Sequence, residues 1–196
     1  SLQGGYYELP QLVFGSEFGP VPYYFYMGEN IMEGKSNFEE QLSLYMQDNL
    51  PDCLGNFSEI KGYDVEMGEL RPEVNVVSDS VIINFNQIAK VTSENRKYEL
   101  NFPSYVIEAN VNDMYKVADR VIENTKNAPK RINMTLLFEL MEEYNFQIDT
   151  MSNEDDKVVY VVQDENNRIN DVPHMFLFAK KVYAGNSPPV IETDKI

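Results

Sequence analysis

The sequence predicts an α+β fold in which helices pack on antiparallel β-meanders, with the elements in the approximate order ββ-α-ββββ-αα-βββ. Two regions, at about 58–108 and 146–183, alternate apolar and polar residues with the period of two that strands require. Amphipathic stripes with a helical period precede and separate these regions. Nothing in the chain supplies the repeated strand-helix-strand alternation from which a parallel sheet is built.

Two short strands are expected near the N-terminus, at 11–14 and 23–27. Glycines and prolines separate them, among them Pro20 and Pro22. Because proline cannot donate a hydrogen bond to a neighbouring strand, we place the second strand at the edge of its sheet.

The first helix has a clear start signal. Ser36-Asn37-Phe38-Glu39 fits a capping box, in which Ser36 accepts from the backbone of Glu39 while the Glu39 side chain reaches back. Pro51 is expected to end the helix. The residues that then share one apolar face are Phe38, Leu42, Tyr45 and Met46.

A meander of about four antiparallel strands follows between residues 58 and 108. Polar turns at 78–80 and 93–96 divide it. The alternating apolar residues are Tyr63, Val65, Met67, Val74, Val76, Val81, Ile83, Phe85, Tyr98, Leu100 and Phe102.

Two helices and a second, shorter meander complete the pattern. An apolar stripe over 111–122 predicts a helix that is broken at Asn127-Ala128-Pro129, and Asn133 is expected to cap the next helix. Strands are expected at 146–151, 157–163 and 174–183.

The domain organisation leaves two alternatives. Residues 1–183 form either one α+β domain or two subdomains, 1–108 and 109–183. Residues 184–196 contain Pro188 and Pro189, which favour an extended chain, so we interpret them as a linker to a downstream domain.

The charge balance excludes two classes of partner. The 32 acidic and 16 basic residues give a formal net charge of −16. Nucleic-acid binding depends on Lys and Arg neutralising phosphates, and anionic membrane surfaces attract basic segments, so neither partner is expected. The sequence also lacks the run of about 18 apolar residues that a membrane-spanning helix needs.

The sequence lacks the common catalytic and cofactor motifs. With His174 as the single histidine there is no zinc-protease motif, and there is no glycine-rich phosphate loop or nucleophile elbow. We therefore predict a non-catalytic domain without a cofactor or metal site. A hydrolase using a carboxylate pair is a less favoured alternative, since Glu142 with Glu143 and Asp155 with Asp156 are typical solvated charges.

Three smaller features have alternatives of their own. Cys53 is expected to be a small buried residue, although a bond to a cysteine outside this stretch and a reactive thiol are alternatives. The loop 164–171 is rich in oxygen ligands for calcium but lacks the glycine and terminal glutamate of an EF-hand. The sequons at Asn56 and Asn133 matter only in an exported protein.

The best candidate binding surface is a set of tyrosines. Tyrosine combines a large contact area with a polar tip and is enriched at interfaces and sugar-stacking sites. Alternation along a strand must still turn about half of such residues inward, so the alternative is that Tyr24 and Tyr26, or Tyr23 and Phe25, cover the first helix as core. The candidates are Tyr6, Tyr7, Tyr23, Tyr24 and Tyr26.

Three strings carry a resemblance to a known group of proteins. Gln3-Gly4-Gly5-Tyr6, Asn49-Leu50-Pro51-Asp52-Cys53-Leu54 and Asn186-Ser187-Pro188-Pro189-Val190-Ile191 resemble sequences of uncharacterised archaeal envelope proteins, especially those of small-genome lineages. Such proteins are anchored by one N-terminal membrane segment. The third string is also similar to the lead-in of immunoglobulin-like or cadherin-like repeats.

The resemblance implies an extracytoplasmic domain between an anchor and a stalk. The start of the chain, without an initiator Met, fits a segment of a longer protein. We therefore expect a surface domain that contacts other surface proteins or itself, with a carbohydrate-binding or adhesion module as the alternative. Strand edges near 23–27 or 176–183 are the expected points of contact with another chain.

Overall fold

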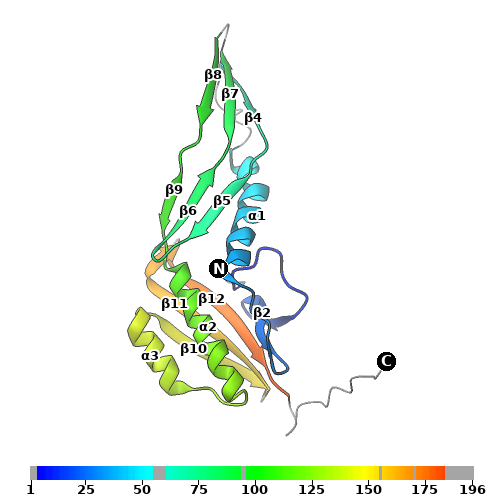
Figure 1. Ribbon diagram of the computed structural model, residues 1–196, viewed down its shortest axis with the longest axis vertical. Helices are drawn as coiled ribbons and strands as arrows, with labels where there is room; N and C mark the ends of the chain where they lie inside the picture. The colour runs from blue at the N-terminus through cyan, green and yellow to red at the C-terminus, as the bar shows by residue number, and fades with distance from the viewer. Residues whose placement is uncertain (1–3, 55–60, 94–95, 155, 170, 184–196) are drawn as a thin grey trace, which may run out of the picture. The chain divides into compact units, whose positions relative to one another are not determined.

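The computed structural model describes residues 4–54, 61–93, 96–154, 156–169 and 171–183 (Figure 1). These ranges contain three helices and twelve strands in largely antiparallel sheets, which confirms the predicted α+β class. The chain forms two compact units. Of the described residues, unit 1 contains Gly4, 9–33 and 114–183, and unit 2 contains 5–8 and 34–113.

Unit 1 is built on a six-stranded sheet in the order β1-β2-β12-β11-β10, with β3 paired to β2. The pairings are antiparallel except that between β2 and β12, where Tyr23 lies opposite Ala179 in a parallel register. This pairing joins the beginning and the end of the chain. The strands are β1 (Val13–Ser16), β2 (Gly19–Tyr26), β3 (Glu29–Asn30), β10 (Gln147–Glu154), β11 (Lys157–Ile169) and β12 (Val172–Lys181).

The prediction that the second strand lies at an edge was wrong, because β2 is paired on both sides. Its two prolines lie where β2 pairs with β1 alone, since the pairing with β12 begins at Tyr23. The Tyr23 amide donates to the Leu12 carbonyl at 3.2 Å, on the β1 side. Amides alternate along a strand, so Pro20 and Pro22 face away from β1 and no ladder hydrogen bond is lost.

Helices α2 (Val111–Asn127) and α3 (Met134–Tyr144) follow the predicted bounds. The Asn133 side chain accepts from the Leu136 amide at 3.1 Å, which confirms the predicted cap. The loop between the helices lies on the sheet face that carries Lys180, because the Lys180 ammonium donates to carbonyls in that loop. The buried apolar residues that these two helices contribute to unit 1 are Met114, Val117, Ala118, Val121, Ile122, Leu137 and Leu140.

The opposite face of the same sheet is also apolar. It carries a buried cluster in which Phe14 of β1 packs on residues of the central strands. A sheet covered on both faces needs nearly continuous apolar strands, which explains the runs 158–162 and 176–179. The cluster consists of Val21, Tyr23, Val159, Val161, Leu177 and Ala179.

Unit 2 contains helix α1 (Lys35–Leu54) and two three-stranded antiparallel sheets, β4-β7-β8 and β5-β6-β9. The region expected to be a meander of about four strands therefore has six, and β4 and β9 pair with strands that are not their neighbours in sequence. The bounds are β4 (Asp64–Met67), β5 (Pro72–Val76), β6 (Ser80–Phe85), β7 (Ile88–Ser93), β8 (Arg96–Asn101) and β9 (Tyr105–Glu108).

The core of unit 2 lies between α1 and the β5-β6-β9 sheet. Phe38 of α1, 5% exposed, is buried together with residues of β5 and β6 and with Val111. Two half-buried residues of the predicted apolar face, Leu42 and Met46, pack against the same cluster. The amphipathic pattern therefore identified three of the four inward residues correctly, whereas the fourth, Tyr45, is 51% exposed.

The predicted start of α1 was wrong. The helix begins at Lys35, so Ser36 lies inside the first turn and is not the cap. The Glu39 carboxylate does not reach back to Ser36; it accepts from the Val76 amide of β5 at 2.9 Å and lies 3.6 Å from Lys35. A tertiary hydrogen bond to a strand amide thus replaces the expected local one.

The predicted end of α1 and the predicted burial of Cys53 were also wrong. Pro51 lies inside the helix, which continues to Leu54. So close to the C-terminal end, proline removes one hydrogen bond and leaves the preceding turns intact. Cys53 is exposed, because this last turn faces solvent.

No helix in the described ranges is long and apolar enough to cross a membrane.

Candidate functional site

The five tyrosines predicted as a binding surface are divided between the two units. Tyr23, Tyr24 and Tyr26 belong to unit 1, and Tyr6 and Tyr7 belong to unit 2. Three of them, Tyr6, Tyr23 and Tyr24, are buried, whereas Tyr7 and Tyr26 are half-buried. A buried ring offers no stacking face to a ligand, which leaves two of the five partly accessible.

The contacts of these rings are structural. Tyr24 stacks on Phe178 at 5.3 Å, and its hydroxyl donates to the Gly4 carbonyl. Tyr23 and Tyr26 contact each other edge to face at 5.2 Å. Tyr7, which lies outside the strand that was expected to cover the first helix, meets Tyr45 of α1 edge to face at 5.4 Å.

Unit 1 contains a pocket of about 260 Å³ on the sheet face opposite α2 and α3. β1, β10, β11 and the turn after β1 form its walls. Met151 and Val159 lie directly opposite each other across β10 and β11, which places both on the pocket face. The lining residues are Phe14, Ser16, Glu17, Met151, Lys157 and Val159.

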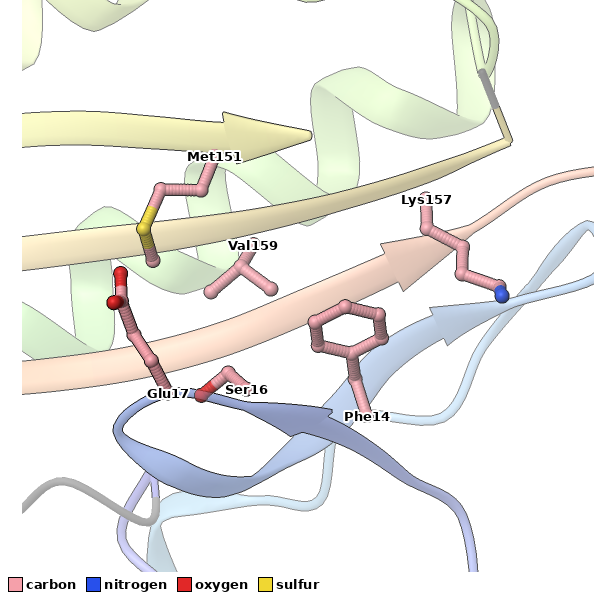
Figure 2. A pocket seen from close by; sticks show the side chains of 6 residues that line it. All are labelled: Phe14, Ser16, Glu17, Met151, Lys157 and Val159. Carbon is pink, nitrogen blue, oxygen red and sulfur yellow. The ribbon is translucent and has the colours of Figure 1, made fainter. Parts of the chain in front are cut away.

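The charges of the pocket are separated. Figure 2 shows Glu17 and Lys157 at opposite ends, with Phe14 and Val159 between them. Among the described residues that line the pocket, Glu17 is the one carboxylate. Glycoside hydrolysis needs two carboxyl groups facing one bond, and the described lining contributes one of them.

His174 lies opposite Asp164 across β11 and β12. Burial lowers the pKa of His174 to about 4, and the negative charge of Asp164 opposes that change only in part. The imidazole is therefore neutral at pH 7. A general base works best when its pKa lies near the operating pH, so a His174 with a pKa of about 4 would be a weak general base at pH 7.

The described residues of the oxygen-rich segment 164–171 lie at the end of the β11-β12 hairpin, where β11 runs to Ile169 and β12 begins at Val172. Asp164 is 1% exposed and accepts from the Asn166 amide at 3.0 Å. Arg168 pairs with Glu165 at 2.5 Å. In the part of the chain that the structure describes, no group of three or more His, Cys, Asp or Glu side chains is placed to hold a metal ion.

The strand edges expected to contact another chain are not available. The predicted segments 23–27 and 176–183 correspond largely to β2 and β12, which pair with each other and with β1 and β11. The described strands with one unpaired edge in unit 2 include β8 and β9, the last strands of the two three-stranded sheets.

Both of these edge strands are exposed along their whole length. Tyr98 and Leu100 of β8 are 45% and 54% exposed. In β9 three consecutive apolar residues, Tyr105, Val106 and Ile107, are 51%, 64% and 52% exposed. Soluble proteins usually protect such edges with charge, proline or a covering loop.

Sequence reasoning recognised residues of β8 but missed β9. The signal was present, because the β-branched and aromatic run at 105–107 lies between Pro103 and the α2 helix and is typical of a strand. The exposure of β9 depends on the strand with which it pairs, and a local sequence pattern does not predict that pairing.

The chain matches no known family model, no curated protein and no solved structure. Its function therefore has to be inferred from the arrangement of its own residues.

Proposed function

We propose that this chain is a non-catalytic protein-protein interaction domain that acts through exposed sheet edges in unit 2. The observation that carries the proposal is the exposure of two strands that end the described sheets of unit 2: β9, which is apolar over residues 105–107, and β8, in which Tyr98 and Leu100 alternate with charged residues. An edge of this kind is a template for pairing with another chain, in which backbone hydrogen bonds give affinity and alternate side chains give specificity.

The location we propose is extracytoplasmic, in a membrane-anchored archaeal surface protein whose anchor lies outside this stretch. The resemblance of three sequence strings to envelope proteins supports it. The net charge of −16 is compatible with it, because an acidic surface keeps a crowded surface protein soluble and repels anionic partners.

Photo-crosslinking in the producing cells tests the proposal. A photoreactive phenylalanine derivative replaces Val106 of β9, or Tyr98 of β8, in the full-length protein. As a matched control it replaces Val172, which is 52% exposed in unit 1. We expect defined protein adducts from positions 98 or 106 and none from position 172. Adducts absent from both edge positions would contradict the proposal.

Carbohydrate binding is a second candidate. The observation in its favour is Tyr45, whose ring is 51% exposed on α1 beside the half-buried Tyr7. Exposed aromatic faces stack on sugars. A glycan array with the natural protein and Tyr45→Ala tests it: binding that the substitution abolishes supports an adhesion function, and an array without signal removes it.

A further inference from the structure

We infer that the partner of β8 is a second copy of this chain, paired antiparallel with β8 about a two-fold axis at Tyr98. The inference rests on the proposed interaction function and identifies one partner for it. It joins two β4-β7-β8 sheets into one continuous six-stranded sheet, since three strands come from each copy.

The β4-β7-β8 sheet has two different faces. On one face Val65, Val91 and Tyr98 lie in a row across the three strands. Met67, Ala89 and Leu100 form the next row on that face. These two rows are apolar, and they end at the β8 edge with two exposed side chains, Tyr98 and Leu100. Arg96 of β8, opposite Ser93, lies on the same face beyond them.

The other face carries charges that alternate in sign from strand to strand. Glu66 of β4 lies opposite Lys90 of β7, and Lys90 lies opposite Glu99 of β8. Opposite charges directly across a strand pair stabilise a sheet, and like charges destabilise it. The row negative, positive, negative therefore favours a cation on any strand added beside Glu99.

β8 supplies that cation itself. With Tyr98 opposite Tyr98 of the second copy, Lys97 of each copy lies opposite Glu99 of the other. The charge row then continues as Glu66, Lys90, Glu99 and the second copy's Lys97. The contact between Lys97 and Glu99 forms twice, because a two-fold interface repeats every contact.

The neighbouring registers are less favourable. A shift of the axis to residue 97 places Lys97 opposite Lys97, and a shift to residue 99 places Glu99 opposite Glu99. An axis that lies between two residues changes the register by one and brings the apolar face of one copy to the side of the charged face of the other. The axis at Tyr98 keeps the apolar faces together and brings the two tyrosines side by side, a favourable cross-strand pair.

Charge reversal tests this register in solution. The natural protein is expected to sediment as a dimer at high concentration. Lys97→Glu places two glutamates opposite each other at both contacts, and Glu99→Lys places two lysines there, so each variant should dimerise about tenfold or more weakly. The matched control is Lys130→Glu, which reverses an exposed lysine of unit 1.

Restoration makes the test specific. An equimolar mixture of the Lys97→Glu and Glu99→Lys proteins pairs unlike charges at both contacts, so it should form heterodimers although neither variant dimerises alone. The double variant with both substitutions should regain dimerisation, although less strongly than the natural protein, because a lysine at position 99 lies opposite Lys90 of its own sheet. These two results are not expected if the substitutions merely disturb folding.

A disulfide trap locates the axis independently. With Cys53 replaced by Ser, Tyr98→Cys should form a disulfide-linked dimer under mild oxidation, whereas Lys97→Cys should not, because its partner is Glu99. A natural protein that stays monomeric at all concentrations overturns the inference, and so does a dimer that neither charge reversal weakens. In both cases heterologous crosslinks from position 98 or 106 would leave the proposed interaction function standing.

Discussion

Lys180 of β12 donates a hydrogen bond to the carbonyl oxygen of Arg131 at 2.8 Å, so a cation on the core face of the sheet holds the loop between α2 and α3. The same ammonium donates to the Pro129 carbonyl at 3.2 Å and lies 6.0 Å from the centre of the Tyr160 ring. Lys180 is 2% exposed, which is unusual for lysine and is explained by these partners.

Lys180→Met should lower the free energy of unfolding at pH 7 by about 1–2 kcal/mol, as measured by urea denaturation. Methionine keeps the volume but removes two hydrogen bonds, while relief from burying a charge offsets part of the loss. The neighbouring Lys181→Met is the control. Lys181 lies half-buried beside the Tyr26 ring, so its loss should be smaller. Equal losses for the two variants would contradict the anchoring role.

The pH dependence of Lys180 gives a second signature. Burial lowers its pKa to about 8 from the ordinary 10.5. Between these values the unfolded chain holds a proton that the folded chain has released, so stability should rise with pH through this window. The rise should appear in the difference between the natural protein and Lys180→Met from pH 7 to 9.5. A flat difference would mean that Lys180 keeps an ordinary pKa.

His174 should make the protein less stable in mild acid. Its folded pKa of about 4 lies below the ordinary 6.5, because burial disfavours the imidazolium. As the pH falls below 6.5 the unfolded chain binds a proton and the folded chain does not, so between pH 7 and pH 5 stability should fall by about 1–2 kcal/mol. In His174→Gln this component should vanish, which thermal melting at the two pH values will show; an unchanged pH dependence would refute it.

Gly5 is required by both its backbone and its surroundings. Its φ is +83°, and a Cβ there would collide with the Phe38 ring. Gly5→Ala should therefore cost about 1–3 kcal/mol in urea denaturation. Gly15→Ala is the matched control, because no atom lies within 4 Å of its Cβ position. A Gly5 variant as stable as the control would show that the N-terminal segment moves away at little cost.

Gln41 of α1 binds two successive backbone amides of the N-terminal segment. Its side-chain oxygen accepts from the amides of Tyr7 and Glu8 at 2.9 and 2.8 Å. Gln41→Leu removes this acceptor and should destabilise the protein by about 1–3 kcal/mol. Gln47→Leu, an exposed position of the same helix, should change the stability little. Faster hydrogen exchange at residues 7 and 8 in the Gln41 variant alone would identify the cause.

The elements predicted best are those whose signals are local. Asn133 caps α3 because one side chain satisfies an amide three residues ahead, a contact independent of the rest of the chain. The stripe of α2 likewise depends on helical spacing alone. Glu39 shows where local prediction fails. Its carboxylate accepts a hydrogen bond from the Val76 amide instead of the expected one from Ser36, and only tertiary packing brings Val76 near.

The candidate site could be predicted only in part. Residues of β8 were recognised as strand, but the edge was assigned to segments 23–27 and 176–183, which the structure pairs with each other. Edge status depends on long-range pairing. The predicted tyrosine surface met the same limit. Tyr6 and Tyr24 are residues of a type enriched at binding surfaces, but the fold buries both of them in its core.

By itself the sequence determined the α+β class, the bounds of α2 and α3, the C-terminal strands and the acidic surface, because periodicity, capping residues and charge are local properties of the chain. Tertiary structure decided that β2 joins β12, that Cys53 faces solvent, and that Glu99 ends a row of alternating charges at an open edge. Each of these depends on contacts between segments that are distant in the sequence. The free energy that favours one set of contacts comes from the packing of whole sheets and is not located in any short segment.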